Sequence, residues 1–257
     1  MNIIIPMSGT GKRFQDAGYR QIKPLIPVEG KPIIQHIIER FGPSDNFILI
    51  CNEVHLAATE LAQVLKKICP QARIIPIKAH KFGPVYAVMR AESHIINEQP
   101  VIVNYCDFSW RWDYADFKDT VAKNRCDGCI LAYRGFHPHL LGPDYYASVK
   151  LSEGNWLEEI KEKYSFTADK MESFQSSGTY YFAKGAYIKK YFPLLMQRNI
   201  DISGEYYVSL VYNLMKEDNL KVFVYEIPYF LQWGTPQDLE DYLYWSDYFH
   251  APGANRQ

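Results

Sequence analysis

Glycines and basic side chains follow a short apolar run at the start of the chain. Gly9 and Gly11 let the backbone approach phosphate oxygens closely, and Arg13 can hold a phosphate through two parallel hydrogen bonds. The loop matches neither the Walker pattern, which ends in Gly-Lys-Ser/Thr, nor the Rossmann spacing. A tight turn with solvated charges is the alternative. If the loop wraps phosphates, the residues expected to contact them are Met7, Ser8, Gly9, Thr10, Gly11, Lys12 and Arg13.

A lysine then stands directly before a proline in an apolar stretch. Lys23 precedes Pro24 within residues 21–28, and a lysine among apolar residues is costly unless it meets an anion. An ammonium group beside a phosphate would stabilise the charge that builds up during phosphoryl transfer. The alternative is a side chain that extends from the apolar loop into solvent.

An aspartate follows the buried strand expected over residues 101–105. Asp107 would lie at the carboxyl end of that strand, where ligands of open α/β sheets bind. Magnesium is held by one or two carboxylates together with water and substrate phosphates, so Asp107 alone can begin such a site. Asp113 is better explained as the cap of the following helix. We therefore expect Asp107 to bind Mg²⁺.

The elements that must position these residues alternate between strand and helix up to Asp107, which predicts a parallel sheet. Strand-like runs then follow one another, so the second half is expected to be mixed or antiparallel. The fold class is α/β, with a doubly wound, mostly parallel (mixed) sheet. Strands are expected over residues 3–5, 47–51, 73–77, 101–105, 129–134, 147–151, 156–160, 179–182 and 222–227. Helices are expected over residues 31–41, 53–67, 85–94, 114–123, 186–196, 205–216 and 236–249.

The composition is that of an ordinary globular chain, with 257 residues of which 47% are hydrophobic, and a net charge of -1. This charge argues against nucleic-acid binding, which depends on clustered basic residues. No apolar run has the length of a membrane span. The start of the chain lacks the features of a signal peptide, and the five cysteines are scattered, so we expect a cytoplasmic protein with reduced thiols.

Two other motifs have the spacing of metal ligands. Cys126 and Cys129 lack a second pair of ligands, and a strand entering the core explains them. His137 and His139 lack a third ligand, and hydrogen bonding in a loop explains them. Residues 252–255 are expected to form a frayed tail.

Three segments together resemble the opening of the sugar-phosphate nucleotidyltransferases. They are residues 6–14 (PMSGTGKRF), 23–26 (KPLI) and 30–34 (GKPII). The resemblance implies the nucleotide-diphospho-sugar transferase fold. It also implies a Mg²⁺-dependent reaction in which a phosphomonoester attacks the α-phosphorus of an NTP and releases pyrophosphate. Arg13, Lys23 and Asp107 would then be the catalytic residues. The chain is expected to be a single domain over 1–257, with an NTP-binding core at 1–125 and an acceptor-binding lobe at 126–257.

The resemblance extends to the later parts of the site. Residues 82–88 resemble the glycine-rich helix start that contacts the nucleobase, which implicates Gly83 and Pro84, although a helix beginning with proline explains the same residues. Glu162 and Lys163 resemble a pair that contacts the acceptor's phosphate. The other positions that resemble acceptor-binding residues are Ser177, Gly178 and Glu205. For Glu205, a favourable place at the start of a helix is the alternative.

One position departs from the family pattern. Many relatives carry a second metal-binding aspartate just before a Gly-Thr pair, and Gln232 takes that place here. A neutral amide oxygen is a weaker ligand of magnesium than a carboxylate. Gln232 is therefore a candidate second ligand, while Asp107, phosphates and water would provide most of the binding.

The function favoured by these motifs is nucleotidyl transfer to a sugar phosphate or other phosphomonoester. Family association suggests precursors of surface polysaccharides, and the Gly-Pro-Val sequence at Gly83 resembles cytidylyltransferases more than thymidylyltransferases, which implies cytidylyl transfer. A glycosyltransferase of the same fold is an alternative, although it would normally show a second acid beside Asp107. A non-catalytic nucleotide-binding module is another, because the second metal-binding acid is missing. A homo-oligomer is compatible with the sequence.

Overall fold

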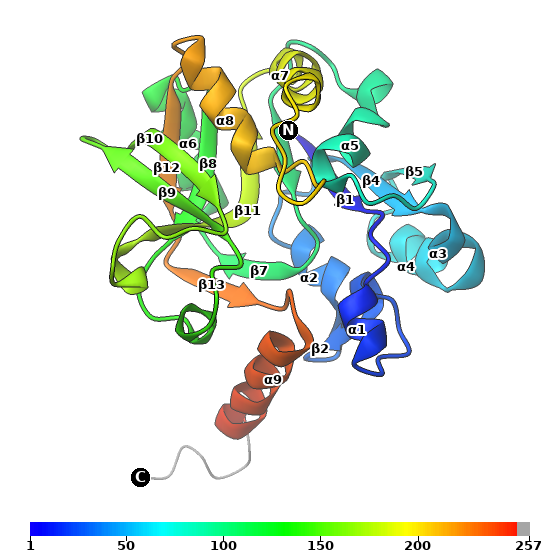
Figure 1. Cartoon of the computed structure of the whole chain (residues 1–257). Helices are drawn as coiled ribbons and strands as arrows, with labels where there is room; N and C mark the ends of the chain where they lie inside the picture. Colours follow the sequence, from blue (N-terminus) through cyan, green and yellow to red (C-terminus); the bar gives the residue numbers. More distant parts are fainter. Residues whose placement is uncertain (251–257) are drawn as a thin grey trace.

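A nine-stranded sheet runs through this computed structural model, which describes residues 1–250 (Figure 1). The strand order is β5-β4-β1-β6-β11-β8-β12-β10-β9. The strands in this order are β5 (Arg73–Ile77), β4 (Asn46–Asn52), β1 (Asn2–Met7), β6 (Val101–Asn104), β11 (Phe174–Phe182), β8 (Gly128–Tyr133), β12 (Val222–Glu226), β10 (Trp156–Glu162) and β9 (Ala147–Ser152).

The two halves of the sheet differ in strand direction. Strands β5, β4, β1 and β6 are parallel, whereas β11 is antiparallel to β6, β8 and β9. Strand β9 also pairs with β10, so the second half curls into a small barrel-like closure. The expected mixed second half is therefore confirmed, whereas a mostly parallel, doubly wound sheet is not, because only the first half is fully parallel. The tight turn between β9 and β10 allows only antiparallel pairing.

Helices cover both faces of the sheet. On one face, an apolar core contains residues of α5 (Gly83–Met89), α7 (Gly185–Gln197) and α8 (Val208–Glu217). On the other face, a second core contains residues of α1 (Lys12–Asp16), α2 (Ile33–Ile38), α4 (Leu61–Ile68), α6 (Tyr114–Asn124) and α9 (Pro236–His250). Helix α3 (Glu53–Ala58) lies beside α4 near the β5 edge (Figure 1). Among the helices of residues 1–250, none combines the length and apolar character that a membrane span requires.

Two short ribbons were not expected from the sequence. Strand β7 (Phe108–Arg111) pairs with β13 (Tyr229–Gln232), and β2 (Pro27–Val28) pairs with β3 (Lys31–Pro32). The first ribbon begins directly after Asp107 and brings Gln232 opposite Phe108. It therefore carries the segment after β13 to the carboxyl end of β6.

Several expected helices have different bounds. The helix expected over residues 53–67 breaks into α3 and α4 at Thr59, which has an extended backbone. The helix expected from residue 205 begins only at Val208, because Ser203 and Gly204 have positive φ values and form a turn. Glu205 is therefore not a helix-opening residue, and the helix-dipole explanation for it is wrong. The tail expected over residues 252–255 lies outside the described residues.

Gly83 is required by a close approach of two backbone segments. Its φ is +79°, and an added Cβ would lie 2.8 Å from both the backbone nitrogen and oxygen of Tyr206. Gly18 has a similar φ of +86° but open space around it. We expect Gly83→Ala to lower the free energy of unfolding roughly 1–3 kcal/mol more than Gly18→Ala, since only Gly83 adds a clash to the backbone strain. Urea unfolding of the two variants measures this difference, and equal losses would contradict the assigned packing.

Candidate functional site

Two adjoining cavities lie at the carboxyl ends of β1 and β6. The first, here called the loop cavity, has a volume of about 330 Å³ and is lined by the glycine-rich loop and the start of α5. The second, here called the tyrosine cavity, has a volume of about 410 Å³ and is lined mainly by residues after β6, in β11 and near β9 and β10. Both cavities share Arg13, Tyr105, Asp107 and Tyr207. A molecule in one cavity can therefore contact a molecule in the other at these residues.

The glycine-rich loop contributes most, but not all, of its expected residues. The loop and turn residues that line the loop cavity are Met7, Ser8, Gly9, Gly11, Arg13, Gly83 and Pro84. Gly11 takes a left-handed conformation with φ +68° directly before α1. Thr10 and Lys12 do not line the cavity, and the Lys12 ammonium group lies 3.1 Å from the carboxylate of Asp16 on the exposed side of α1.

Lys23 points into the site rather than out to solvent. Its Nζ lies 3.0 Å from Asp107 Oδ2 and donates to the carbonyl oxygen of Gly234, also at 3.0 Å. The ammonium group also lies 5.2 Å from the centre of the Phe14 ring. Only 16% of the side chain is exposed. The alternative of a solvated lysine is therefore excluded, and Lys23 and Asp107 meet where the two cavities join.

The donor set around Asp107 fits a single-carboxylate magnesium site. Its side chain is 35% exposed and lines both cavities, so a carboxylate oxygen can reach a metal-phosphate complex there. Across residues 1–250, no group of three or more histidine, cysteine or acidic residues could hold a metal ion by itself. Asp113 instead caps α6, since its carboxylate accepts from the backbone of Ala115 and Asp116 at 2.9 and 3.0 Å. Any magnesium ion would depend on substrate phosphates for part of its coordination.

Gln232 lies behind the site rather than in its lining. Its amide nitrogen donates to the hydroxyl of Tyr146 and, at 2.8 Å, to the carboxylate of Asp238. Its amide oxygen is buried and has no partner within the described part of the chain. Tyr146 lines the tyrosine cavity, whereas Gln232 does not. Tyr146 thus connects Gln232 to the site.

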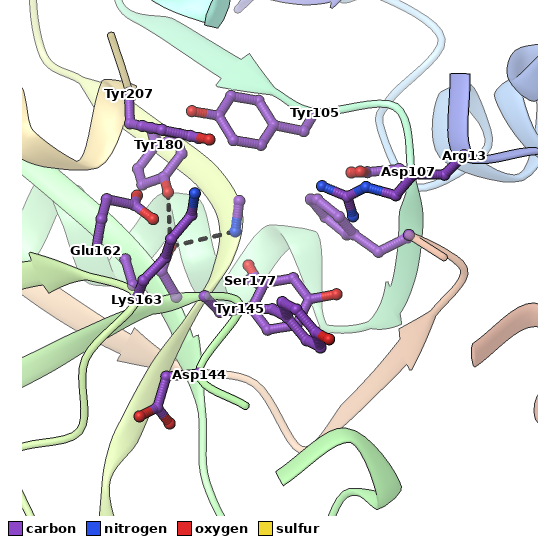
Figure 2. Close-up of a pocket in the computed structure, with 16 residues that line it drawn as sticks. Arg13, Tyr105, Asp107, Asp144, Tyr145, Glu162, Lys163, Ser177, Tyr180 and Tyr207 are labelled. Carbon is purple, nitrogen blue, oxygen red and sulfur yellow. Dashed lines mark hydrogen bonds between the residues drawn. The ribbon is translucent and has the colours of Figure 1, made fainter. Parts of the chain in front are cut away.

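Aromatic side chains surround the tyrosine cavity (Figure 2). Arg13 and Asp107 lie on one side of it, and Glu162 and Lys163 on the other. The tyrosines in its lining are Tyr105, Tyr145, Tyr146, Tyr180 and Tyr207. Aromatic faces with hydroxyl groups suit an acceptor that has both apolar faces and hydrogen-bonding groups.

Strand β11 supplies the floor of the tyrosine cavity. Ser177 and Gly178 both line it, and an added Cβ on Gly178 would lie 2.5 Å from the ring of Phe108. The Ser177 hydroxyl is buried and has no hydrogen-bond partner among residues 1–250. A buried hydroxyl without a partner costs free energy, so this one is suited to bond with a ligand.

Lys163 and Glu205 lie in different cavities. Lys163 lines the tyrosine cavity and has a left-handed backbone, with φ +51°. Its ammonium group lies 5.9 Å from the centre of the Tyr207 ring. Glu205 lines the loop cavity next to Gly83, and its carboxylate accepts from the Tyr207 hydroxyl. The structure therefore places Glu205 on the side of the glycine-rich loop.

Glu162 has the most perturbed carboxyl group of the tyrosine cavity. Burial raises the pKa of this carboxyl to about 7, while a hydrogen bond from Ser209 and the charge of Lys163 act in the opposite direction. An unfolded glutamate loses its proton near pH 4.3, so between these pH values the folded state binds more protons than the unfolded state. This group therefore makes stability fall as pH rises from about 4 to about 7.

We expect Glu162→Gln to remove that dependence. The unfolding free energy of the variant minus that of the native protein should rise by roughly 1–3 kcal/mol as the pH goes from 5 to 8, because glutamine has no charge to bury. Urea unfolding at both pH values measures the gain. Glu158→Gln, on the exposed side of the same strand, is the matched control. If the difference in unfolding free energy between the native protein and Glu162→Gln were the same at both pH values, Glu162 would titrate normally.

Several cavity residues were missed from the sequence, in which the dense tyrosine pairs, Tyr206 and Tyr207 among them, favour packing over an acceptor pocket. His80 and Lys81 line the loop cavity, and Tyr105 and Tyr207 line both cavities. Tyr105 could have been found, because it stands two positions before Asp107 on the same strand end. His80 gives no comparable signal, since its place depends on contacts with a distant segment.

The remaining motifs are structural. Cys126 and Cys129 are buried thiols at the start of β8, and burial raises the pKa of Cys126 to about 11. His139 accepts or donates a hydrogen bond with Tyr133 at 2.9 Å. Burial in the core accounts for Cys126 and Cys129, and the bond to Tyr133 accounts for His139.

Comparisons with known proteins agree with the geometry. Residues 3–167 match the MobA-like NTP transferase domain. A bifunctional protein GlmU from Methanocaldococcus jannaschii is 26% identical over 223 residues, which cover 86% of this chain and 48% of that protein. A second GlmU, from Alkaliphilus metalliredigens, is 24% identical over 227 residues, covering 88% of this chain and 47% of that protein. The chain spans about half the length of the curated relatives it matches.

Solved structures share the fold at low sequence identity. A nucleoside-diphosphate-sugar pyrophosphorylase from Vibrio cholerae RC9 aligns with a TM-score of 0.75 and 19% identity, covering 94% of this chain and 99% of that one. The inositol-1-phosphate CTP transferase from T. maritima aligns with a TM-score of 0.70 and 15% identity, covering 97% of this chain and 96% of that one. The domain match includes the glycine-rich loop, Lys23 and Asp107. The chain therefore belongs to the MobA-like NTP transferase domain family.

Proposed function

We propose that this protein transfers a nucleotidyl group from an NTP to a phosphomonoester. An oxygen of the acceptor's phosphate attacks the α-phosphorus, the bond between the α-phosphorus and the bridging oxygen breaks, and pyrophosphate leaves with that oxygen. One observation supports this most: two cavities, one beside a glycine-rich loop and the other walled by tyrosines, share Arg13 and Asp107, and Lys23 in the loop cavity is bonded to Asp107. Such an arrangement brings two anionic substrates together beside fixed positive charge.

The loop cavity would hold the triphosphate. The backbone at Gly9 and Gly11 would contact its phosphates, and Arg13 would hold an outer phosphate through parallel hydrogen bonds. Lys23 would stabilise the charge that develops on the α-phosphate. Gly83 and Pro84 would contact the nucleobase, and Glu205 would lie beside them.

Asp107 would hold a magnesium ion together with phosphate oxygens and water. When bound, such an ion would neutralise phosphate charge and orient the α-phosphate for attack. Asp107 now accepts from Lys23 at 3.0 Å, which keeps the carboxylate directed at the junction of the cavities. Gln232 supports Tyr146 in this scheme, and its buried amide oxygen lies outside the lining of both cavities, so the ion is assigned to Asp107 alone among the side chains.

The tyrosine cavity would hold the acceptor. Lys163 and Arg13 would neutralise its phosphate, while Ser177 and Glu162 would bond to its hydroxyl groups. The fold is shared with a nucleoside-diphosphate-sugar pyrophosphorylase and an inositol-1-phosphate CTP transferase, which supports a sugar or polyol phosphate as the acceptor. We favour a cytoplasmic role in making surface-polysaccharide precursors, with CTP as the nucleotide.

A glycosyltransferase is the weaker candidate. It would use a nucleotide sugar and would not need Gly11, Arg13 and Lys23 around a triphosphate. The junction also presents one carboxylate, Asp107, rather than a pair. A non-catalytic module is weaker still, because such a module would not need a lysine held at the junction of two cavities.

A thermal-shift screen with the four ribonucleoside triphosphates and Mg²⁺ tests the proposal. Binding to the folded state raises its stability by mass action, by about 2.7 kcal/mol at a ligand concentration of 100 times Kd. We expect one NTP, CTP in our proposal, to raise the melting temperature more than the others and more than nucleotide sugars do. A shift with nucleotide sugars alone would favour the glycosyltransferase.

A further inference from the structure

His80 joins two segments that are distant in sequence and both line the loop cavity. Its Nε2 lies 3.0 Å from the hydroxyl of Ser8 in the glycine-rich loop. Its Nδ1 accepts from the backbone N–H of Phe82 at 3.3 Å, directly before Gly83. The ring also packs against Tyr86, with centres 4.6 Å apart. Ser8 and His80 both line the cavity, although His80 has no place in the functions assigned above.

These two contacts determine which ring nitrogen carries the proton. A backbone N–H can only donate, so Nδ1 must accept and is unprotonated. In the neutral ring the proton is then on Nε2, which donates to the oxygen of Ser8. Burial lowers the pKa of His80 and so favours the neutral ring.

The hydroxyl hydrogen of Ser8 is left for another acceptor. Because the Ser8 oxygen already accepts from His80, its own hydrogen can donate elsewhere, and Ser8 faces the cavity. The Ser8 backbone is fixed separately, since Asn52 donates to its carbonyl oxygen at 3.3 Å. An anionic oxygen in the loop cavity is the natural acceptor for this hydrogen.

We propose that His80 is a positioning residue for the nucleotide: it directs the Ser8 hydroxyl toward a triphosphate oxygen and ties the glycine-rich loop to the turn at Gly83. This inference rests on the proposed function, because it assumes that a triphosphate occupies the loop cavity. It assigns no proton transfer to His80.

The chain offers variants that separate the two contacts of His80. Glutamine can place an N–H group near the position of Nε2 and so keep the donor to Ser8. Asparagine can keep an acceptor near Nδ1 for Phe82 but is too short to reach Ser8. Ser8→Ala removes the hydroxyl itself, and His55→Asn, a half-buried histidine outside both cavities, is the matched control.

We expect His80→Asn and Ser8→Ala each to raise the KM for the NTP roughly tenfold, as the loss of one hydrogen bond to a charged group predicts. The turnover at saturating NTP and the KM for the acceptor should change less than about threefold, because the contact acts on nucleotide binding. The double variant should be no worse than the poorer single variant, since both changes remove the same interaction. His80→Gln should retain most of the nucleotide affinity, and His55→Asn should match the native protein.

Calorimetric titration with the NTP separates this inference from the proposed function. If the native protein binds the NTP but transfers nothing, the proposed function fails while the Kd values of the variants still test His80. Additive losses in the double variant, or equal rises in both KM values, would show a merely structural role. Native affinity in His80→Asn would overturn the inference, and should the asparagine variant fail to fold, native affinity in a folded Ser8→Ala would overturn it equally.

Discussion

Replacing Lys23 by alanine is expected to lower kcat at least ~100-fold, because preorganised charge at the reacting phosphate is the main catalytic contribution in this account. The ammonium group is held by Asp107 and by the carbonyl oxygen of Gly234, both at 3.0 Å, so it is already in place before the substrates bind. Steady-state kinetics with the preferred NTP and acceptor measure the loss.

The control for this prediction is Lys67→Ala, which removes an exposed lysine of α4 that lines neither cavity. It should retain native turnover. Lys23→Ala should still unfold cooperatively, and its unfolding midpoint should be measured alongside. A loss of turnover below about tenfold in a folded Lys23→Ala would mean that Lys23 is not a transition-state residue.

Replacing Asp107 by asparagine is also expected to lower turnover at least ~100-fold. The change keeps the size of the side chain but removes the negative charge that would hold a magnesium ion. It also leaves the Lys23 ammonium without its carboxylate partner. The loss should be larger at limiting Mg²⁺ than at saturating Mg²⁺, because an amide oxygen binds the ion more weakly.

Titration of turnover against Mg²⁺ measures this effect. Asp119→Asn, on the exposed face of α6, is the matched control and should follow the native titration. If Asp107→Asn loses turnover equally at every Mg²⁺ concentration, Asp107 acts through Lys23 rather than as a metal ligand. If neither Lys23→Ala nor Asp107→Asn changes turnover or cellular function, a non-catalytic module becomes the better account.

Local sequence signals were enough to predict the first half of the fold. Strand β5 has the expected bounds, and the apolar runs of β1, β4 and β6 are strands of a parallel sheet. These buried strands form continuous apolar runs, which is the clearest strand signal in a sequence. The same logic placed Asp107 at a strand end beside the glycine-rich loop.

The second half depends on contacts that no short window contains. The β7–β13 ribbon pairs strands of four residues that are more than a hundred positions apart, and so short a run has little periodicity. Glu205 had a plausible place at a helix start, but the turn at Ser203 and Gly204 delays α8 to Val208. Tertiary pairing thus determined these bounds more than local preference did.

The glycines and most of the charged residues of the site were predicted from the sequence, whereas the aromatic residues that line it were not. Gln232 was compared with a metal-binding acid by position, yet its partners are Tyr146 and Asp238, which come from other elements. His80 became visible only when its two hydrogen bonds were known. Residues whose role depends on a hydrogen bond to a distant residue form no recognisable motif in a single sequence.

Pyrophosphate release is the most direct test of the central claim. Purified protein should be incubated with Mg²⁺, each of the four NTPs and a panel of sugar and polyol phosphates, with a coupled assay for pyrophosphate. The account predicts release that requires both an NTP and one class of acceptor, with an NDP-linked product formed in equal amount. No release with any NTP across the whole panel, from a protein shown to be folded, would contradict it.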